Sequence, residues 1–225
     1  MKNGTSFDWT VLGLAFVAGM VDVTGWLLLH GIFTAHVTGN IVVIAAHSVA
    51  PVPDRPAALL AVPTFFLIAL LAHVWVQKRG VPSGAPTLLS GQTLLLAATT
   101  LISIIGGTRG GQDGPVAIAV ALTATAAMAV QNVYLHTVRH PSPSTAVMTG
   151  NLTNFAMAVA DVLTGNPSGR AAVKRAWPLL AGFIIGCVIG AVTATTLTTW
   201  AWSLPLLASA GVILLARKSK TFIAR

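Results

Sequence analysis

Long apolar runs separated by short polar breaks dominate this chain. Charged residues, proline and glycine bound these runs, which predict eight helical segments at about residues 9–30, 32–50, 57–77, 86–106, 115–138, 144–164, 176–199 and 202–216. Six of the segments are long and apolar enough to be transmembrane helices. The second and sixth each carry Thr-Gly-Asn with only about fourteen residues after it, so we expect two short broken or re-entrant helices there.

The breaks between the segments have the composition of turns. The stretches "QKRGVPSGAP" at 77–86 and "GNPSGR" at 165–170 combine glycine, proline and polar residues, which we expect to prevent a helix from continuing. Because the connections are short and no long hydrophilic stretch separates the segments, we predict a single membrane domain.

The two halves of the chain resemble each other at a spacing of about 110 residues. "VDV" at 21–23 and "TGN" at 38–40 are matched by "QNV" at 131–133 and "TGN" at 149–151. We therefore predict two internal membrane repeats, residues 1–110 and 111–225. If the short segments are re-entrant, each half crosses three times and the repeats are inverted. If they cross the membrane, each half has four spans and the repeats are parallel.

Composition favours a polytopic integral membrane protein of the all-α class. Of the 225 residues, 55% are hydrophobic and 8% are charged, with a mean hydropathy of +0.81, whereas soluble domains are roughly a quarter charged. The net charge of +8 comes from Lys and Arg between or beyond the apolar runs, which indicates membrane topology and not nucleic-acid binding. Either number of spans keeps most of these residues cytoplasmic, with both termini in the cytoplasm.

Asp22 is the strongest candidate for a functional group. It lies about thirteen residues into the first predicted helix, roughly 20 Å from the start of that helix and near the bilayer centre. An ionised Asp there costs about 2.5–3.5 kcal/mol, so we expect it to face the protein interior, a wet cavity or a partner, or to be protonated. The functional interpretation is a proton or cation site, and the structural one is a hydrogen-bond anchor between helices.

The Thr-Gly-Asn sequences supply most of the other candidates. Gly lets the backbone bend, Asn can cap a helix start, and a helix N-terminus inside the membrane presents open N–H groups to a solute or anion. Alternatively, Gly39 and Gly150 permit tight helix packing while the Asn side chains form hydrogen bonds across the interface. The candidate solute-binding residues are Asp22, His36, Thr38, Gly39, Asn40, Asn132, Thr149, Gly150, Asn151 and Asn154.

The sequence predicts no enzyme, no metal site and no cofactor. The chain has no Glu, a single cysteine at Cys187, no nucleotide-binding glycine-rich loop with Lys, and no clustered acid, base and nucleophile. Among its six histidines only His136 and His140 form a His-x3-His pair, and none of the six has a Cys or Glu at ligand spacing.

Two further features are expected to serve structure. Asp161 and Arg170 are close in sequence and predict an interfacial ion pair. Gly182, Gly186 and Gly190 share one helix face, and this small-residue stripe is expected to pack two helices, within the chain or between copies.

The sequence "GLAFVAGMVDVTGWLLLHGIFTAHVTGN" at 13–40, with "MTGNLTN" at 148–154, resembles the YoaK-like family of small bacterial inner-membrane proteins. The resemblance covers nearly the whole chain. It implies a bacterial cytoplasmic-membrane protein of about six spans, and it supplies no substrate or reaction. Its signature positions are Asp22, His36, Thr38, Gly39, Asn40, Thr149, Gly150 and Asn151.

These features favour a transporter or channel for a small polar solute or ion. We expect its site at the membrane midplane between the two repeats, lined by Asp22, Asn40, Asn132 and Asn151 with His36 beside them. The expected partners are membrane lipids and the solute, with no nucleic acid, and a homo-oligomer is compatible with the sequence. The alternative is a non-transporting membrane module that binds lipid or a partner protein through its glycine faces.

Overall fold

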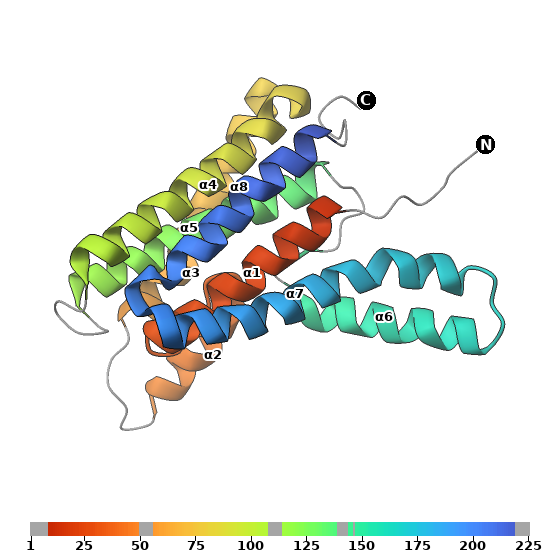
Figure 1. The fold of residues 1–225 in the computed structure, drawn as a ribbon, viewed down its shortest axis with the longest axis horizontal. Coiled ribbons are helices and arrows are strands. Elements are labelled where there is room, and N and C mark those ends of the chain that lie inside the picture. Colours follow the sequence, from red (N-terminus) through yellow and green to blue (C-terminus); the bar gives the residue numbers. More distant parts are fainter. Residues whose placement is uncertain (1–8, 50–55, 108–113, 139–143, 146, 219–225) are drawn as a thin grey trace.

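The computed structural model describes residues 9–49, 56–107, 114–138, 144, 145 and 147–218. The elements are α1 (Trp9–Leu28), α2 (Thr38–His47), α3 (Pro56–Arg79), α4 (Val81–Gly106), α5 (Pro115–Val138), α6 (Met148–Leu163), α7 (Gly169–Leu197), the 3₁₀ helix η1 (Thr198–Trp202) and α8 (Ser203–Lys218) (Figure 1). No strand occurs in these ranges. The predicted all-α class is therefore confirmed.

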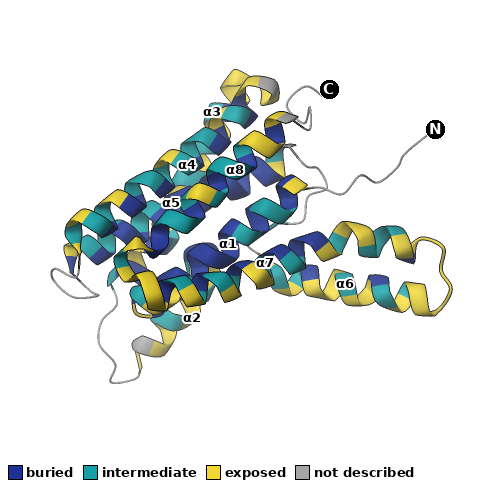
Figure 2. Cartoon of the chain, in the orientation of Figure 1, coloured by how far each residue is buried: buried dark blue, intermediate teal, exposed yellow. Residues whose placement is uncertain are grey.

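Five helical segments are long and apolar enough to cross a membrane. They are Trp9–Leu28, Pro56–Arg79, Ser83–Gly106, Pro115–Thr137 and the helical stretch Gly169–Arg217, which contains α7, η1 and most of α8. Large apolar side chains such as Phe66 and Leu94 are exposed on the outer helices, whereas α1 and α5 hold much of the buried interior (Figure 2). Apolar helices with apolar outer surfaces make this a multi-pass membrane protein.

The break between α3 and α4 is shorter than the sequence predicts. We expected a turn over 77–86, but α3 continues to Arg79 and α4 begins at Val81. Gly80 alone separates them, with a φ of 77° that glycine adopts without steric penalty. Pro82 falls in the first turn of α4, where a missing N–H breaks no helical hydrogen bond. The predicted ten-residue turn is therefore wrong.

Most of the helix pairs that pack together have a counterpart when the two halves of the chain are exchanged, but α3 with α4 does not, because η1 lies between α7 and α8. α1 packs against α7 and α5 against α3, α4 packs against α5 and α8 against α1, and α2 contacts α3 as α6 contacts α7. The exchange replaces α1 by α5, α2 by α6, α3 by α7 and α4 by α8, and the reverse. It converts each of these pairs into another observed pair. The pairs α1 with α5 and α4 with α8 are each converted into themselves.

Corresponding helices of the two halves run in opposite directions. At the end of α1, Leu28 lines the same pocket as Ala117 at the start of α5. Near the start of α1, the carbonyl of Leu14 accepts a hydrogen bond from Gln131 near the end of α5. α1 and α5 are therefore antiparallel, and Figure 1 shows the same opposition between α4 and α8.

α1 and α7 approach closely along the glycine stripe of α7. A Cβ atom at Gly182 would lie 2.5 Å from the carbonyl oxygen of Leu12, and one at Gly186 would overlap the carbonyl of Phe16. Gly190 is buried in the same helix face. The stripe therefore packs two helices within one chain, which confirms the first of its two predicted uses.

Candidate functional site

The chain turns back along α1 after that helix ends. Residues 29–37 return until the backbone N–H groups of residues 34–36 reach the side chain of Asp22. Asp22 lies six residues before Leu28, the last residue of α1, so the loop returns by about 9 Å at 1.5 Å per residue. α2 begins at this depth, at Thr38.

The carboxylate of Asp22 holds the returning loop. One oxygen accepts hydrogen bonds from the backbone N–H groups of Thr34 at 2.8 Å and Ala35 at 2.6 Å. The other accepts the backbone N–H of His36 at 3.2 Å and lies 2.5 Å from its ring atom Nδ1. Asp22 is only 4% exposed, and a carboxylate offers about four acceptor sites. Its observed contacts are therefore those of a hydrogen-bond anchor, made to a loop and not to a second helix.

Asp22 also sets the hydrogen-bonding role of His36. Because a carboxylate only accepts hydrogen bonds, Nδ1 must carry a proton, which leaves Nε2 of the neutral ring as an acceptor. Nε2 is buried and has no hydrogen-bond partner among the described residues. The ring also meets Phe183 edge-on, with centroids 5.0 Å apart. A buried acceptor without a partner costs about 1–3 kcal/mol, and a bound solute, water or proton would satisfy it.

Asn40 closes the same loop from the first turn of α2. Its side-chain oxygen accepts the backbone N–H of Phe33 at 2.9 Å, and its Nδ2 donates to the Phe33 carbonyl at 2.7 Å. A Cβ at the neighbouring Gly39 would lie 2.8 Å from the Phe33 ring, so Gly39 lets this ring pack against α2. No side chain caps the start of α2 or α6. The expectation that Asn caps a helix here is therefore wrong, because Asn40 bonds the backbone seven residues earlier.

The second half makes corresponding contacts with neutral groups. Nδ2 of Asn151 donates to the carbonyl of Ser144 at 2.7 Å, again seven residues earlier. The hydroxyl of Ser144 donates to Oδ1 of Asn132 at 2.9 Å. Asn132 lies six residues before Val138, the last residue of α5, as Asp22 does in α1. In both halves, the Asn of Thr-Gly-Asn thus bonds the residue seven positions earlier, and described residues of the segment before the short helix bond the preceding long helix.

Gln131 extends this second group of contacts, although it was not among the predicted site residues. It is fully buried. Its Nε2 donates to the carbonyl of Leu14 and to the hydroxyl of Thr145, each at 3.0 Å, and its Oε1 accepts from Gln92 at 2.8 Å. Thr145 and Thr34 both stand six residues before the Asn of Thr-Gly-Asn. That shared position is the signal that could have identified both threonines.

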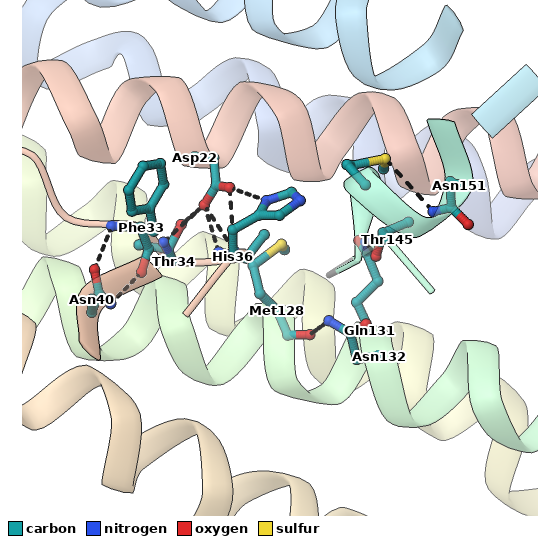
Figure 3. A network of polar contacts seen from close by, with 12 residues as sticks. Asp22, Phe33, Thr34, His36, Asn40, Met128, Gln131, Asn132, Thr145 and Asn151 are labelled. Carbon is teal, nitrogen blue, oxygen red and sulfur yellow. Dashed lines mark hydrogen bonds and ion pairs between the residues drawn. The ribbon is translucent and has the colours of Figure 1, made fainter. Parts of the chain in front are cut away.

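Both groups of contacts reach α1. We call the first the Asp22 cluster, which consists of Asp22, Phe33, Thr34, Ala35, His36 and Asn40. We call the second the Gln131 cluster, which consists of Gln92, Gln131, Asn132, Ser144, Thr145 and Asn151. Asp22 and Leu14 are eight residues apart on this helix, which is about 12 Å. Figure 3 shows the imidazole of His36 on the side of Asp22 that faces the Gln131 cluster. The fold thus brings the polar residues of both halves into the interior of one bundle.

Comparison with known proteins identifies the family of this chain. Residues 10–216 match the family described as "Protein of unknown function (DUF1275)". The chain belongs to this family. No curated protein and no solved structure matches it. The narrower resemblance to YoaK-like proteins stays a prediction within this uncharacterised DUF1275 family.

Five of the predicted site residues of this DUF1275 protein lie outside both clusters, and one of them, Gly39, lies against the ring of Phe33 in the Asp22 cluster. Thr38, Thr149 and Asn154 are exposed. A Cβ at Gly150 would meet only Val147, at 3.4 Å. α2 and α6 direct Asn40 and Asn151 toward the preceding loop, so the other residues of each motif fall on different faces of the helix.

Other potential ligand groups of this DUF1275 protein are dispersed. No group of three or more His, Cys, Asp or Glu gathers in the described part of the chain. Asp161, near the end of α6, accepts a hydrogen bond from Nδ2 of Asn166 at 3.1 Å. The ion pair predicted between Asp161 and Arg170 does not form between these two described residues, so that prediction is wrong.

Two pockets lie toward opposite ends of α5 in this DUF1275 protein. One, of about 250 Å³, is lined by Ala117 near the start of the helix and by Trp202 of η1. The other, of about 620 Å³, is lined by Asn132 and His136 near the end of the helix and by Ser144. The Gln131 cluster therefore contributes two side chains to an accessible pocket.

Proposed function

We propose that this DUF1275 protein is a transporter or channel for a small polar solute or ion, with its site in the bundle interior between two inverted repeats, residues 1–110 and 111–225. One observation carries the proposal. Returning loops meet Asp22 and Asn132 at the same depth, six residues before the ends of two helices that run in opposite directions. Inverted repeats with helices that start inside the membrane are a common transporter architecture.

The proposal favours six membrane crossings over eight. Inverted repeats need an odd number of crossings in each half, which α1, α3 and α4 supply in the first half and α5, α7 and α8 in the second. α2 has ten residues, about 15 Å at 1.5 Å per residue, which is half of the ~30 Å hydrocarbon core. The antiparallel direction of α1 and α5 supports the same choice, because parallel repeats would make them parallel.

The positions of basic residues support cytoplasmic termini. Lys78 and Arg79 end α3, Arg170 and Lys174 lie in the first turns of α7, and Arg217 is near the end of α8. These helix ends lie on the side of the bundle where α1 begins, the right-hand side of Figure 1. Since Lys and Arg are retained in the cytoplasm, that side is the cytoplasmic one. The resemblance to bacterial proteins supports the assignment of this membrane as a bacterial inner membrane.

In this proposal His36 contacts the solute and Asp22 is a positioning residue. The buried Nε2 of His36 can accept an N–H or O–H group of a solute, or bind a proton and become a donor. Asp22 fixes the ring through Nδ1. Across the interior, Gln131 and Asn151 hold Thr145 and Ser144 in place through neutral hydrogen bonds.

The second candidate is a non-transporting module that binds lipid or a partner protein. The glycine face of α7, expected to serve it, already packs against α1. Its remaining support is α6, which is exposed along most of its length and carries Asn154, an exposed amide without a hydrogen bond to the described residues. An Asn on a membrane helix favours association with another helix.

Flux into liposomes tests the two candidates. The purified protein is reconstituted, and swelling after an osmotic jump is followed by stopped-flow light scattering with glycerol, acetate and ammonium as neutral, anionic and cationic probes. Transport predicts faster swelling than in protein-free liposomes for at least one probe. His36→Phe, which keeps an aromatic ring beside Phe183 but removes Nε2, should slow it, and Asp161→Asn should not. Folded protein that accelerates none of the three probes would contradict transport.

A further inference from the structure

The pocket near the end of α5 has the size of a small-molecule site. Its volume is about 620 Å³, within the range of about 300–1,000 Å³ that is usual for ligand pockets. Residues of α3, of α5 and of the segment before α6 line it together. Because it includes Asn132 and Ser144, it joins the Gln131 cluster to the outside of the bundle.

The α3 wall of the pocket changes from apolar to polar along the helix. Phe65, Ala69, His73 and Gln77 follow each other at intervals of four residues, so this wall extends over about 18 Å. Its apolar part lies toward the middle of α3. Its polar part lies near the end of α3, where Nε2 of Gln77 is 3.2 Å from Nε2 of His73. A molecule with one apolar and one polar end matches this wall.

α5 adds hydrogen-bonding groups to the same pocket. Asn132 and His136 are four residues apart and both line it. Asn132 is only 6% exposed and uses one N–H of its amide to donate to the carbonyl of Met128 at 3.0 Å. An amide nitrogen carries two hydrogens, so the second N–H stays available to a ligand from a rigid position.

The groups in and beside the pocket favour an anion over a cation. Its lining contains the imidazoles of His73 and His136, whose ring N–H groups can donate hydrogen bonds, and no carboxylate among the described residues. Lys78 and Arg79 follow directly at the end of α3. A cleft surrounded by one sign of charge raises the local concentration of ions of the opposite sign.

We propose that this pocket binds a small organic anion, with its carboxylate or phosphate group between His73 and His136 and its apolar part toward Phe65. The proposal rests on the proposed function, because it names the chemical class of the solute and brings it to Asn132. An anionic lipid headgroup shares this chemistry. We assign the pocket to a soluble anion, and the experiment below separates the two sources.

Protection of an introduced cysteine tests the assignment. Cys187→Ser removes the only native cysteine, and Ala69→Cys then places a thiol in the pocket wall. The rate of maleimide labelling in detergent is measured with hexanoate and with hexylammonium, which have the same apolar chain and opposite charge. We expect hexanoate to slow labelling by the factor 1 + [L]/Kd, about elevenfold at ten times Kd, and hexylammonium to have no effect.

Two variants serve as controls. Leu70→Cys lies one position further along α3, outside the pocket lining, where Leu70 is 45% exposed, and neither amphiphile should change its labelling. The double substitution His73→Gln and His136→Gln, made in the Ala69→Cys chain, should abolish protection by hexanoate. Equal protection by both amphiphiles, protection of Leu70→Cys as well, or no protection at all would overturn the proposal.

Reconstitution separates the two sources of the anion and the two proposals. If vesicles containing phosphatidylglycerol protect Ala69→Cys and added hexanoate changes nothing further, the pocket belongs to lipid and the proposal is overturned. If hexanoate protects but no probe crosses the liposome membrane, transport fails and the anion site stands. Flux without protection overturns the pocket assignment alone.

Discussion

Replacing Asp22 by Asn removes the charge of the anchor while keeping its shape. All the groups that the carboxylate contacts are donors, including two backbone N–H groups of the returning loop on one oxygen and two groups of His36 on the other. Asn keeps one oxygen for the backbone N–H groups of Thr34 and Ala35. Its NH2 group then faces the N–H of His36, so one donor is left without an acceptor.

The magnitude of this loss follows from the contacts. A hydrogen bond to a charged group contributes about 1.5–3 kcal/mol, and an unsatisfied buried donor costs about 1–3 kcal/mol. The ring of His36 can recover one contact by moving its proton to Nε2, so that Nδ1 accepts from the new amide. We therefore expect Asp22→Asn to lower the free energy of unfolding by about 2–4 kcal/mol. The same proton shift converts the buried Nε2 from an acceptor into a donor.

Cys187 provides the assay, because it is the single cysteine and is only partly exposed in α7. Its reaction with a thiol-reactive dye during heating in detergent reports unfolding. For a chain of 150–250 residues, a loss of 2–4 kcal/mol corresponds to a fall in Tm of about 4–16 °C. Asp161→Asn is the matched control, since its carboxylate accepts one exposed hydrogen bond from Asn166. If the two variants had the same Tm as the wild type, the anchor role of Asp22 would be refuted.

Three further substitutions test the packing of α1 on α7 and the contact of Asn40 with Phe33. Gly186→Ala forces a Cβ into the carbonyl of Phe16 and should lower the stability by about 1–3 kcal/mol, measured by the same heating assay. Gly211→Ala is the control, because a Cβ there meets nothing within 4 Å. It should leave the stability unchanged or raise it by up to about 1 kcal/mol. Equal losses of stability in both variants would refute the close approach of α1 and α7. Asn40→Ala removes two hydrogen bonds to Phe33 and should cost about 1–3 kcal/mol, and an unchanged Tm would contradict its role.

The sequence predicted several helices well because hydrophobic length decides them, whereas α2 begins at Thr38 and not at 32, and α7 begins at Gly169 and not at 176. The bounds of α1, α5 and α6 agree with their predicted segments to within a few residues, since each run is ended by glycine, proline or charge. The predicted start of α4 was wrong because Pro82 is tolerated in the first turn of a helix. The composition of residues 77–86 also does not reveal that Gly80 alone makes the turn.

The sequence also singled out Asp22, Asn40, Asn132 and Asn151, but not what they contact. Most of their contacts are backbone N–H and C=O groups of returning loops, and every residue except proline carries both groups. Side-chain type therefore gives no sign of the partner. The choice between inverted and parallel repeats was equally open, because both arrangements place nearly the same number of Lys and Arg in the cytoplasm.

The faces of the short helices could not be predicted. Thr38, Thr149 and Asn154 stand beside residues of the clusters in sequence, yet they are exposed. Neighbouring residues of a helix point about 100° apart, so one polar motif is divided between the interior and the surface. Only the packing of α2 on α3 and of α6 on α7 decides which side each residue takes.

The central claim for the first half, that the chain turns back after α1, is tested most directly by the sidedness of two cysteines. In a Cys187→Ser background, Val49→Cys lies just after α2 and Lys78→Cys lies at the end of α3. A membrane-impermeant maleimide is added from outside to right-side-out vesicles. Six crossings with cytoplasmic termini predict that Val49→Cys is labelled and Lys78→Cys is protected. The reverse pattern, which eight crossings require, would contradict the account.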